Sequence, residues 1–480
     1  MKNKILSLLN LLLIIMMSTP ATTISTASSA AQIDDFVTQQ MARHHLPGLA
    51  LVITQGNQVI YQKGFGNGIT PQTQFYLASV SKSFTAMAIM QLVEARKVDL
   101  DAPIQRYLPD FMTRDLEASR LVTVRQLLNQ TSGMADSGFP EVRLPQMKTP
   151  AERVHSLQSA RPVASPGKEF HYFNPNYDVL ARLVEVASGQ TFSAYLESHI
   201  FTPLGMKKTF NVLRTDEAEK KSSDLAQGHV LPFGIPIPAN EMIGYVGGSA
   251  GVISTAEDLA NFLIMQNQEG QFGNQAIVSP ESIALMQTPP TGIETNYGMG
   301  WFVSQEDGQK ILDHNGILSV FYAEVVLLPE DQIGMALLYN ASSLSATTFA
   351  FPEIKNGLIA LLNGHQAKKG KFTVVHWGIV FAVLTLAGVG LALNSLIHLP
   401  NWAQWAAGKP LWQLLPGIVW ALAPPILLLL IPSIVASGSG RVFSYMALLR
   451  SMLELYVWVG TSAIFGLANA IGRLYYLIFR

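Results

Sequence analysis

The sequence contains no cysteine and few charged residues. Without cysteine the protein cannot form a disulfide, use a thiolate nucleophile or bind a metal through sulfur, whichever side of a membrane it occupies. Charged residues make up 14% of the chain and the formal net charge is -1. Because this balance creates no overall attraction to nucleic acid or to an acidic surface, we expect no nucleic-acid partner.

The sequence also lacks histidine and carboxylate residues at the spacing of a zinc site. Its adjacent His44 and His45 are better explained as the solvated end of a helix. The sequence therefore predicts neither a metal nor a cofactor.

Apolar residues are abundant, at 49% of the chain, and they concentrate at its two ends. Lys2 and Lys4 precede an apolar run at 5–17, which a small and polar stretch follows. This order is typical of an export signal, and the run is too short to span a bilayer comfortably. The sequence predicts a signal peptide at 1–30 with cleavage near Ala30, and an uncleaved anchor is the alternative.

Three further apolar stretches follow a basic linker at 366–373. Each is long enough to cross a hydrocarbon core of about 30 Å as a helix, so residues 374–480 are expected to form a transmembrane region. Prolines within the second stretch are expected to kink it, and the third begins beside Arg450 and Glu454. The predicted spans are 374–393, 411–435 and 453–471.

The distribution of basic residues conflicts with the orientation that the export signal imposes. An exported catalytic region forces the first span to run inward, which places more basic residues outside than inside, against the positive-inside rule. We follow the signal, because the first topogenic element usually dominates, and we expect 368–371 to lie on anionic lipid headgroups. The predicted location is the inner membrane, multi-pass, with the catalytic domain on the periplasmic side. The outer residues are Lys368, Lys369, Lys371, Arg441 and Arg450, and the inner ones are Lys409, Arg473 and Arg480.

Residues 31–365 form one catalytic region without repeats or charged blocks. Pairs of strand-like segments around the short turns at 55–58 and 329–332 predict a hairpin near its start and another near its end, and the sequence between them is mostly helical in pattern. The expected fold class is α+β, an antiparallel sheet flanked by helices with an inserted all-helical subdomain. The predicted strands are 49–53, 59–65, 319–328 and 333–339, and the predicted helices include 79–96, 175–187 and one opened by the capping box Ser254-Thr255-Ala256-Glu257.

Ser79 and Lys82 form an S-x-x-K motif at the start of a predicted apolar helix. One helical turn brings the amine within reach of the serine hydroxyl, and apolar surroundings should lower the pKa of the amine. Free N–H groups at the helix start favour an anionic intermediate. We predict that Ser79 is the nucleophile and Lys82 its base, with a capping serine and a surface lysine as the alternative. Ser165 and Lys168 repeat the spacing, but they enclose a Pro-Gly turn without fixed geometry.

Ser249 is a rival nucleophile, because residues 247–251 fit the G-x-S-x-G elbow. An elbow requires a strand directly before it and a helix directly after it. Residues 241–246 are a poor strand, and the next predicted helix begins only at Ser254. The sequence therefore favours Ser79.

Several motifs occur together within residues 31–365, and with them the chain resembles the serine β-lactamase and penicillin-binding-protein superfamily. The resemblance lies with its class C β-lactamase-like and DD-peptidase-like branch. It implies the α+β fold of that superfamily and catalysis through an acyl-enzyme. The motifs are Ala78-Ser79-Val80-Ser81-Lys82, Leu127-Leu128-Asn129-Gln130-Thr131-Ser132-Gly133, Pro203-Leu204-Gly205-Met206, residues 251–259 and Tyr297-Gly298-Met299-Gly300-Trp301.

The Tyr-x-Asn motif of the superfamily matches Tyr172-Phe173-Asn174. The resemblance implies that Tyr172 shuttles protons and that Asn174 binds substrate. A phenol held near a lysine ammonium is expected to ionise well below its usual pKa of about 10 and then to serve as a base.

The superfamily's third motif, Lys or His followed by any residue and glycine, matches His314-Asn315-Gly316. The resemblance implies that this segment binds substrate through His314 and Asn315. Gly316 is expected to leave room for the substrate backbone. By the same resemblance, the N–H groups of Ile317 and Ser79 form the oxyanion hole.

Two departures from the superfamily's pattern limit the choice of function. His314 replaces the lysine usual in class C β-lactamases, and His-x-Gly looks more like DD-peptidases, D-amino-acid peptidases and esterases. Gln130 replaces a histidine common in the Thr-Ser-Gly segment of relatives, and no consequence of that change follows from the sequence.

The predicted function is a membrane-anchored, extracytoplasmic serine peptidase or amidase acting on D-amino-acid-containing or N-acyl-D-amino-acid substrates. One alternative is suggested by the layout of the chain, which is similar to membrane-bound prodrug-activating D-asparagine peptidases of nonribosomal peptide pathways. An esterase, a β-lactamase and a slowly acylating penicillin-binding sensor are the others. The expected partners are a small peptide, amide or ester substrate and membrane lipid, and the oligomeric state is left open.

Overall fold

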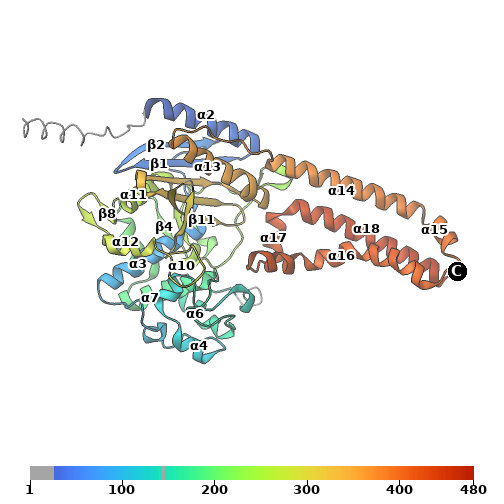
Figure 1. The fold of residues 1–480 in the computed structure, drawn as a ribbon, viewed down its shortest axis with the longest axis horizontal. Coiled ribbons are helices and arrows are strands. Elements are labelled where there is room, and N and C mark those ends of the chain that lie inside the picture. The colour runs from blue at the N-terminus through green and yellow to red at the C-terminus, as the bar shows by residue number, and fades with distance from the viewer. Residues whose placement is uncertain (1–25, 140, 142–145, 307, 480) are drawn as a thin grey trace, which may run out of the picture.

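A six-stranded antiparallel sheet forms the centre of the catalytic region (Figure 1). The computed structural model describes residues 26–139, 141, 146–306 and 308–479, so the predicted export signal lies almost wholly outside the described residues. The strands come from both ends of the catalytic region, as predicted. In spatial order they are β10 (Phe302–Glu306), β11 (Gln309–Ile317), β12 (Tyr322–Leu328), β13 (Ile333–Tyr339), β1 (Gly48–Gln55) and β2 (Gln58–Gly66).

The sheet separates two apolar cores, and strand β1 shows how. Leu49, Leu51 and Ile53 belong to one core, and Ala50 and Val52 to the other, because successive side chains of a strand point to opposite faces. A strand buried on both faces reads as a continuous apolar run. The first core is covered by α2 (Thr26–His44) and α13 (Phe351–Leu362), and the second by α3 (Ser81–Glu94) and α11 (Ala256–Asn267).

The predicted α+β class is confirmed, because the chain between β2 and β10 supplies a set of helices that packs on the second face of the sheet. These are, besides α3 and α11, α4 (Leu116–Leu121), α5 (Val124–Leu128), α6 (Pro150–Ser156), α7 (Asn174–Ser188), α8 (Phe192–Leu196), α9 (Ala218–Lys221), α10 (Gly247–Ala250) and α12 (Pro280–Met286). The short strands are β3 (Phe75–Tyr76), β4 (Phe210–Asn211), β5 (His229–Val230), β6 (Ile237–Pro238), β7 (Val252–Ser254), β8 (Gln271–Phe272), β9 (Gln275–Ala276) and β14 (Ala341–Ser342).

The start of α11 differs from the predicted capping box. Thr255 caps the helix, and its side chain accepts the N–H of Asp258. Ser254 is the last residue of β7, and its hydroxyl lies 2.7 Å from that of Thr209. The strand therefore includes Ser254 before the helix begins, and the cap moves one residue along the chain.

The prediction that His44 is solvated is wrong. Its side chain is fully buried, with Nε2 3.2 Å from a carboxylate oxygen of Glu353. The backbone N–H of Val374 donates to its Nδ1 at 3.4 Å. Burial lowers the pKa of the imidazole despite the neighbouring carboxylate. His44 thus joins α2 and α13 to the start of the first predicted membrane span.

Three helices are long and apolar enough to cross a membrane among the residues that the structure describes. They extend together from one end of the catalytic region, and α18 packs against both of the others (Figure 1). The second helix continues unbroken through its four prolines. Their bounds exceed the predicted spans and are α14 (Val374–Ile397), α16 (Leu411–Ser439) and α18 (Leu453–Ile478), with the shorter α15 (Leu399–Ala406) at the far end and α17 (Tyr445–Ser451) beside the catalytic region.

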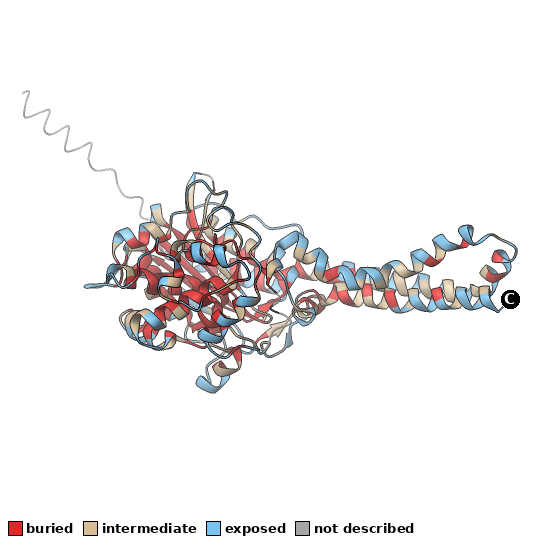
Figure 2. Ribbon diagram, turned by 90° about the horizontal axis from the view of Figure 1, so that it is seen from below, coloured by how far each residue is buried: buried red, intermediate tan, exposed pale blue. Residues whose placement is uncertain are grey.

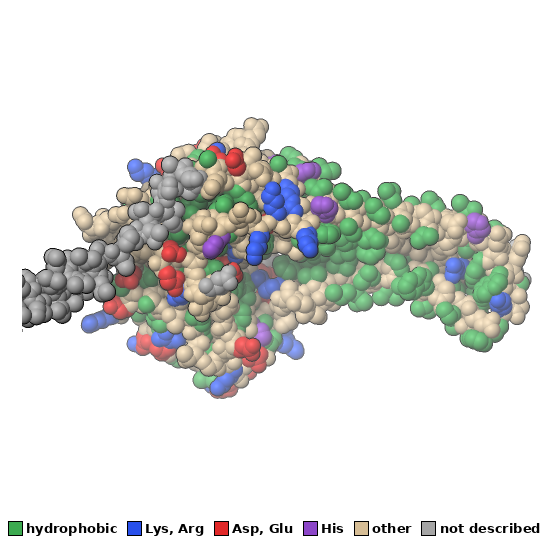
Figure 3. Space-filling model, turned by 45° about the horizontal axis from the view of Figure 1, so that its top comes forward, with side chains coloured by type: hydrophobic (Ala, Val, Ile, Leu, Met, Phe, Trp, Pro, Cys, Tyr) green, Lys and Arg blue, Asp and Glu red, His purple; other side chains and the backbone are tan. Residues whose placement is uncertain are grey.

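The surface of these helices is apolar and exposed. Figure 2 shows that buried residues fill the catalytic region, whereas only scattered segments of the long helices are buried. Figure 3 shows hydrophobic side chains along the length of these helices. Leu386, Trp420 and Leu429 are among the large exposed side chains. Because water would solvate such a surface poorly, the chain associates with a membrane through this region.

The charged residues beside the third span contact the catalytic region. Glu454 accepts the N–H of Phe233 at 2.8 Å. Arg450 donates to the carbonyl oxygen of Asn240 at 2.7 Å and to the hydroxyl of Ser319 at 3.2 Å. These charges therefore hold the two regions together rather than entering lipid.

Gly378 of α14 allows a close approach to the catalytic region. A Cβ at this position would lie 2.5 Å from the carbonyl carbon and oxygen of Phe233. We expect Gly378→Val to destabilise the full chain by about 1–3 kcal/mol, because the helix must move away. Thermal unfolding in detergent measures this change. Gly390→Val in the same helix, where a Cβ meets nothing within 4 Å, is the matched control, and equal unfolding temperatures for the two variants would contradict the prediction.

Candidate active site

Ser79 lies in a short 3-10 turn, Ala78–Val80, directly before α3. The sequence placed it on the helix itself, but α3 begins at Ser81 with Val80 as its cap. Ala78 has φ 47°, a conformation that costs free energy in residues with a side chain. The turn still leaves the Ser79 backbone N–H at the N-terminal end of α3, where an anion is stabilised.

Gly316 of β11 packs directly against this turn. A Cβ at Gly316 would lie 2.0 Å from the carbonyl oxygen of Leu77 and 2.9 Å from the N of Ser79. The glycine therefore admits the segment that carries the nucleophile, where the sequence had suggested room for a substrate backbone.

Lys82 is fully buried beneath Ser79. Its Nζ lies 2.9 Å from Ser79 Oγ, 2.9 Å from Asn174 Oδ1 and 2.8 Å from the carbonyl oxygen of Ser249. The last two atoms can only accept hydrogen bonds, whereas the serine hydroxyl can also donate. A neutral amine fits this arrangement, because its two hydrogens go to the two acceptors and its lone pair faces the hydroxyl of Ser79.

The surroundings of Lys82 favour that neutral form. Burial is the largest effect and lowers its pKa well below the usual value, and the nearby cation Arg441 lowers it further. The carboxylates of Asp178 and Asp136 act in the opposite direction. Asp178 is itself buried, which raises its pKa to about 6. Lys82 is therefore suited to accept a proton.

Tyr172 lies beside the lysine, with Lys82 Nζ 4.9 Å from the centre of its ring. Burial raises the pKa of the phenol to about 12, although Ser79 and Arg441 lower it in part. The expectation that this phenol ionises readily is therefore wrong, because burial outweighs the neighbouring cations. A protonated Tyr172 phenol can donate a proton, whereas a neutral Lys82 amine can accept one.

Gln130 fixes the segment that carries Tyr172. Its side-chain oxygen accepts the N–H of Phe173 at 3.1 Å and the amide of Asn176 at 2.6 Å, and its carbonyl oxygen accepts the N–H of His171 at 2.9 Å. The sequence gave no role to this residue, since its partners lie more than 40 positions away.

His314 lies behind the site, with 1% of its surface exposed. Its Nδ1 is 2.7 Å from the carbonyl oxygen of Asn315, and its Nε2 is 3.4 Å from the hydroxyl of Tyr297. Burial lowers its pKa to about 3, and Lys82 contributes to the shift. The ring is therefore neutral and supports the wall of the site from behind, where the resemblance had implied contact with substrate.

One pocket of about 550 Å³ brings the predicted residues together. Its lining includes Ser79, Tyr172, Asn174, Asn315 and Ile317. The pocket can thus expose a carbonyl group to the serine hydroxyl, with the lysine below and the phenol beside it.

Sequence reasoning missed two parts of this pocket, Asp136 and the loop Ser439–Ser444 between α16 and α17. Asp136 follows the Thr-Ser-Gly segment closely, which is a weak signal. The Gly-Ser-Gly-Arg sequence that ends α16 interrupts an apolar run. Neither signal shows that the two segments meet.

The rival serines occupy other settings. Ser165 and Lys168 are both exposed, in a turn. Ser249 lies in the short helix α10, which the sequence failed to predict, and its hydroxyl donates to the carbonyl oxygen of Val246 at 3.1 Å. Its own carbonyl oxygen accepts from Lys82, so Ser249 supports the base.

Comparison with known proteins places this site in a family. The family model described as Beta-lactamase matches residues 33–358. The chain belongs to the Beta-lactamase family. The match covers the sheet, the helical region and every predicted site residue, and it ends before the three membrane helices.

Among curated proteins, the chain is 29% identical over 344 residues to penicillin-binding protein 4 of Amycolatopsis lactamdurans, a match covering 67% of this chain and 87% of that one. It is 26% identical over 328 residues to Protein flp of Staphylococcus aureus, covering 66% of this chain and 64% of the relative's length. The chain therefore spans slightly under two thirds of the latter protein.

Solved structures share the fold. The octameric penicillin-binding protein homologue from Pyrococcus abyssi superposes with a TM-score of 0.60 at 29% identity, covering 71% of this chain and 78% of that one. The hydrolase EstCE1 superposes with a TM-score of 0.58 at 21% identity, covering 74% of this chain and 100% of that one. The second similarity concerns the fold alone.

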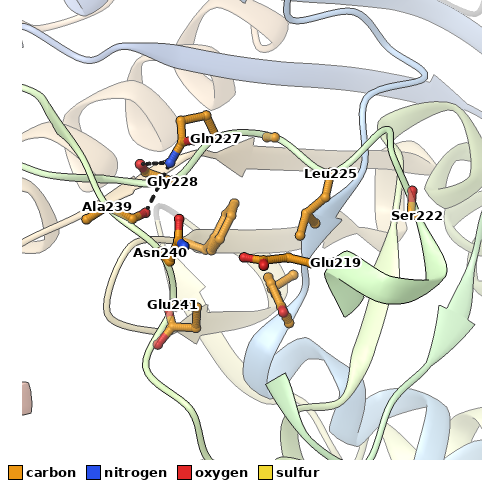
Figure 4. Close-up of a pocket in the computed structure, with 11 residues that line it drawn as sticks. Glu219, Ser222, Leu225, Gln227, Gly228, Ala239, Asn240 and Glu241 are labelled. Atoms are coloured by element: carbon orange, nitrogen blue, oxygen red, sulfur yellow. Dashed lines mark hydrogen bonds between the residues drawn. The ribbon is translucent and has the colours of Figure 1, made fainter. Parts of the chain in front are cut away.

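A second pocket of this β-lactamase-family chain lies apart from the nucleophile (Figure 4). Its lining includes Glu219, Ser222, Asn240 and Glu241, and neither lysine nor histidine is among its lining residues in the described part of the chain. Figure 4 shows Glu241 pointing away from the other labelled side chains. Glu241 accepts from the hydroxyl of Ser319 at 2.8 Å and from the N–H of Val320 at 3.1 Å, so its carboxylate serves the loop before β12. No group of three or more His, Asp or Glu within the described ranges could hold a metal ion.

The pKa of His314 predicts how stability depends on pH. Its ordinary pKa of about 6.5 in the unfolded chain falls to about 3 in the folded protein. The unfolded state therefore binds more protons between these values, and the stability contributed by the neutral ring is present above pH 6.5 and lost as pH falls toward 3. As pH falls through this window, we expect the free energy of unfolding of the unmodified chain to fall by up to about 1.4 kcal/mol per pH unit more than that of His314→Gln. Chemical denaturation at pH 7, 6 and 5 measures the difference, and parallel curves would refute the assignment.

Proposed function

We propose that this chain is a membrane-anchored serine hydrolase that acts through an acyl-enzyme on Ser79. The observation that carries the proposal is the set of contacts around the Lys82 amine, which leaves its lone pair for the Ser79 hydroxyl. A buried, neutral lysine next to a serine is an activated nucleophile pair. Membership of the Beta-lactamase family supports the same chemistry.

The proposed reaction is hydrolysis in two acyl transfers. Ser79 Oγ attacks the substrate carbonyl while its proton passes to Lys82, and the N–H groups of Ser79 and Ile317 stabilise the oxyanion. The bond to the leaving group then breaks, the leaving group takes a proton from Tyr172, and the phenol regains one from Lys82. Water then loses a proton to Lys82 and attacks the ester, the bond to Ser79 Oγ breaks to release the acid, and Lys82 returns its proton to Ser79 Oγ.

The proposed substrates are peptides or amides that contain a D-amino acid, including N-acyl-D-amino acids. The His-x-Gly motif at His314 supports this class through its resemblance to DD-peptidases. Asn174 and Asn315 line the pocket, and the side-chain amide of Asn174 can supply hydrogen bonds for a substrate backbone.

The proposed location puts the catalytic region on the periplasmic side of the inner membrane. The basic residues Arg441 and Arg450, which oppose the positive-inside rule, are bonded to Asp136 and Asn240 of the catalytic region. They are therefore not free charges beside the bilayer, which eases the conflict. Figure 3 shows further Lys and Arg side chains where the apolar helices meet the catalytic region, a position suited to anionic headgroups.

Loss of the nucleophile tests the function. We expect Ser79→Ala to lower kcat/KM on a D-alanyl peptide or an N-acyl-D-amino acid by at least about 10³-fold, because the residual rate comes from binding alone. Ser249→Ala, which keeps the carbonyl oxygen that Lys82 contacts, should retain most activity. Hydrolysis by purified full chain in detergent is measured, and the reverse ranking of the two variants would assign the chemistry to Ser249.

Labelling with a fluorescent penicillin separates a hydrolase from a sensor. A hydrolase should react with the label at Ser79. With its own substrate it should turn over, because water reaches the acyl-enzyme ester on Ser79. An adduct that persists for hours, together with no turnover of any D-peptide, amide or ester offered, would instead identify a slowly acylating sensor.

Protease accessibility tests the orientation. In spheroplasts, added protease is expected to cut the catalytic region and to spare the segment at the far end of the helices, around α15. Protection of residues 31–365 would place the catalytic region in the cytoplasm and overturn the proposed location.

A further inference from the structure

The loop Ser439–Ser444 is the part of the membrane region that reaches the active-site pocket. It joins α16 to α17 and lies at the end of the helices that faces the catalytic region. Ser439, Arg441, Val442, Phe443 and Ser444 line the same pocket as Ser79. One wall of the site is therefore made by residues outside the matched family region, which ends at 358.

Arg441 makes the most specific contacts of this loop. Its Nε donates to Asp136 Oδ2 at 2.7 Å, and the backbone N–H of Val442 donates to the same oxygen at 3.1 Å. Two donors from adjacent residues thus converge on one carboxylate whose side chain is 8% exposed. Such a paired, largely desolvated contact has a defined geometry, unlike an exposed ion pair.

The guanidinium also lies against Tyr172. Its central carbon is 4.9 Å from the centre of the phenol ring, within the range of a cation–π interaction. Phe302 stacks near the same ring with a centroid distance of 6.4 Å and an angle of 10°. A planar cation bonded to Asp136 and packed on the ring restricts how Tyr172 can turn.

The membrane region also contacts the catalytic region at places away from Arg441. Arg450 and Glu454 bind Asn240, Ser319 and Phe233 of the catalytic region. None of these five residues lines the active-site pocket. The contacts of Arg441 with Asp136 and Tyr172 are therefore additional to the anchoring contacts, and they are directed at the catalytic groups.

We propose that Arg441 is a positioning residue that the membrane region supplies, which holds Tyr172 in place beside Ser79 and Lys82. The proposal rests on the proposed hydrolase function. It follows that the catalytic groups take their working arrangement only when the loop is docked, so the membrane helices contribute to the site as well as to anchoring.

The charges around Tyr172 give this role a measurable signature. Besides the Lys82 amine of α3, the ionisable groups that act on the ring or on that amine are Asp136 from the turn before α6, Asp178 from α7 and Arg441 from the loop, and Glu141 lines the same pocket. Tyr177, Tyr297 and His314 face them as neutral groups. Removing the Arg441 cation should make protonation of Lys82 easier, which raises the pKa of the base. Activity would then be lost first at low pH.

The experiment compares Arg441→Met, Arg441→Lys and Arg450→Met in full chain purified in detergent. The second-order rate of Ser79 acylation by a fluorescent penicillin is measured from pH 5 to 9, with circular dichroism to check folding. We expect Arg441→Met to lower the rate about tenfold or more at pH 6 and less at pH 9. The acid limb, which is the part of the pH–rate profile where the rate falls toward low pH, should therefore move to higher pH. Arg441→Lys should keep the limb near its original position, because the charge remains.

Arg450→Met is the matched control, because it removes an anchoring arginine of the same region that does not line the pocket. We expect its acid limb to stay where it is in the unmodified chain. If Arg441→Met leaves the acid limb unmoved and lowers the acylation rate no more than Arg450→Met does, Arg441 only attaches the loop and the proposal is overturned. If the unmodified chain shows no labelling that Ser79→Ala removes, the proposed function itself fails, and that outcome is distinct.

Discussion

Removal of the Lys82 amine from water is the constraint on which the rest of the site depends. An ammonium removed from water is costly even with three hydrogen-bonding partners around it, and burial therefore lowers the pKa of the group. The two fixed acceptors, Asn174 Oδ1 and the carbonyl oxygen of Ser249, then determine where the lone pair points. Two helices of the helical region supply these acceptors, since α7 carries Asn174 and α10 carries Ser249.

The same burial explains the division of roles between the two proton carriers. A low-dielectric environment disfavours the charged form of both side chains, so it lowers the pKa of the lysine and raises that of the tyrosine. One environment thus prepares an acceptor and a donor at once. Gly316 and the strained turn at Ala78 bring the nucleophile to both of them.

Local patterns predicted the parts of the molecule whose determinants are close in sequence. The S-x-x-K motif at the start of an apolar helix predicted the contact between Ser79 and Lys82. The strand-like runs at both ends of the catalytic region predicted the sheet, and the apolar stretches after residue 370 predicted the three long helices. The sequence could not show the contact between Arg441 and Asp136, which are 305 positions apart, or the bonds from Gln130 to the Tyr172 segment. It also assigned the wrong protonation to Tyr172, because the depth of burial is a property of the assembled fold.

The length of α16 has a consequence for how substrate reaches the enzyme. Its 29 residues extend about 44 Å, which exceeds a hydrocarbon core of about 30 Å. When such a helix crosses the core, its excess length can carry the pocket wall that follows it to the level of the lipid headgroups. A substrate that partitions into this layer can diffuse laterally to the pocket in two dimensions. The amount of substrate per unit of membrane area, rather than its concentration in solution, then determines how often the active site is occupied.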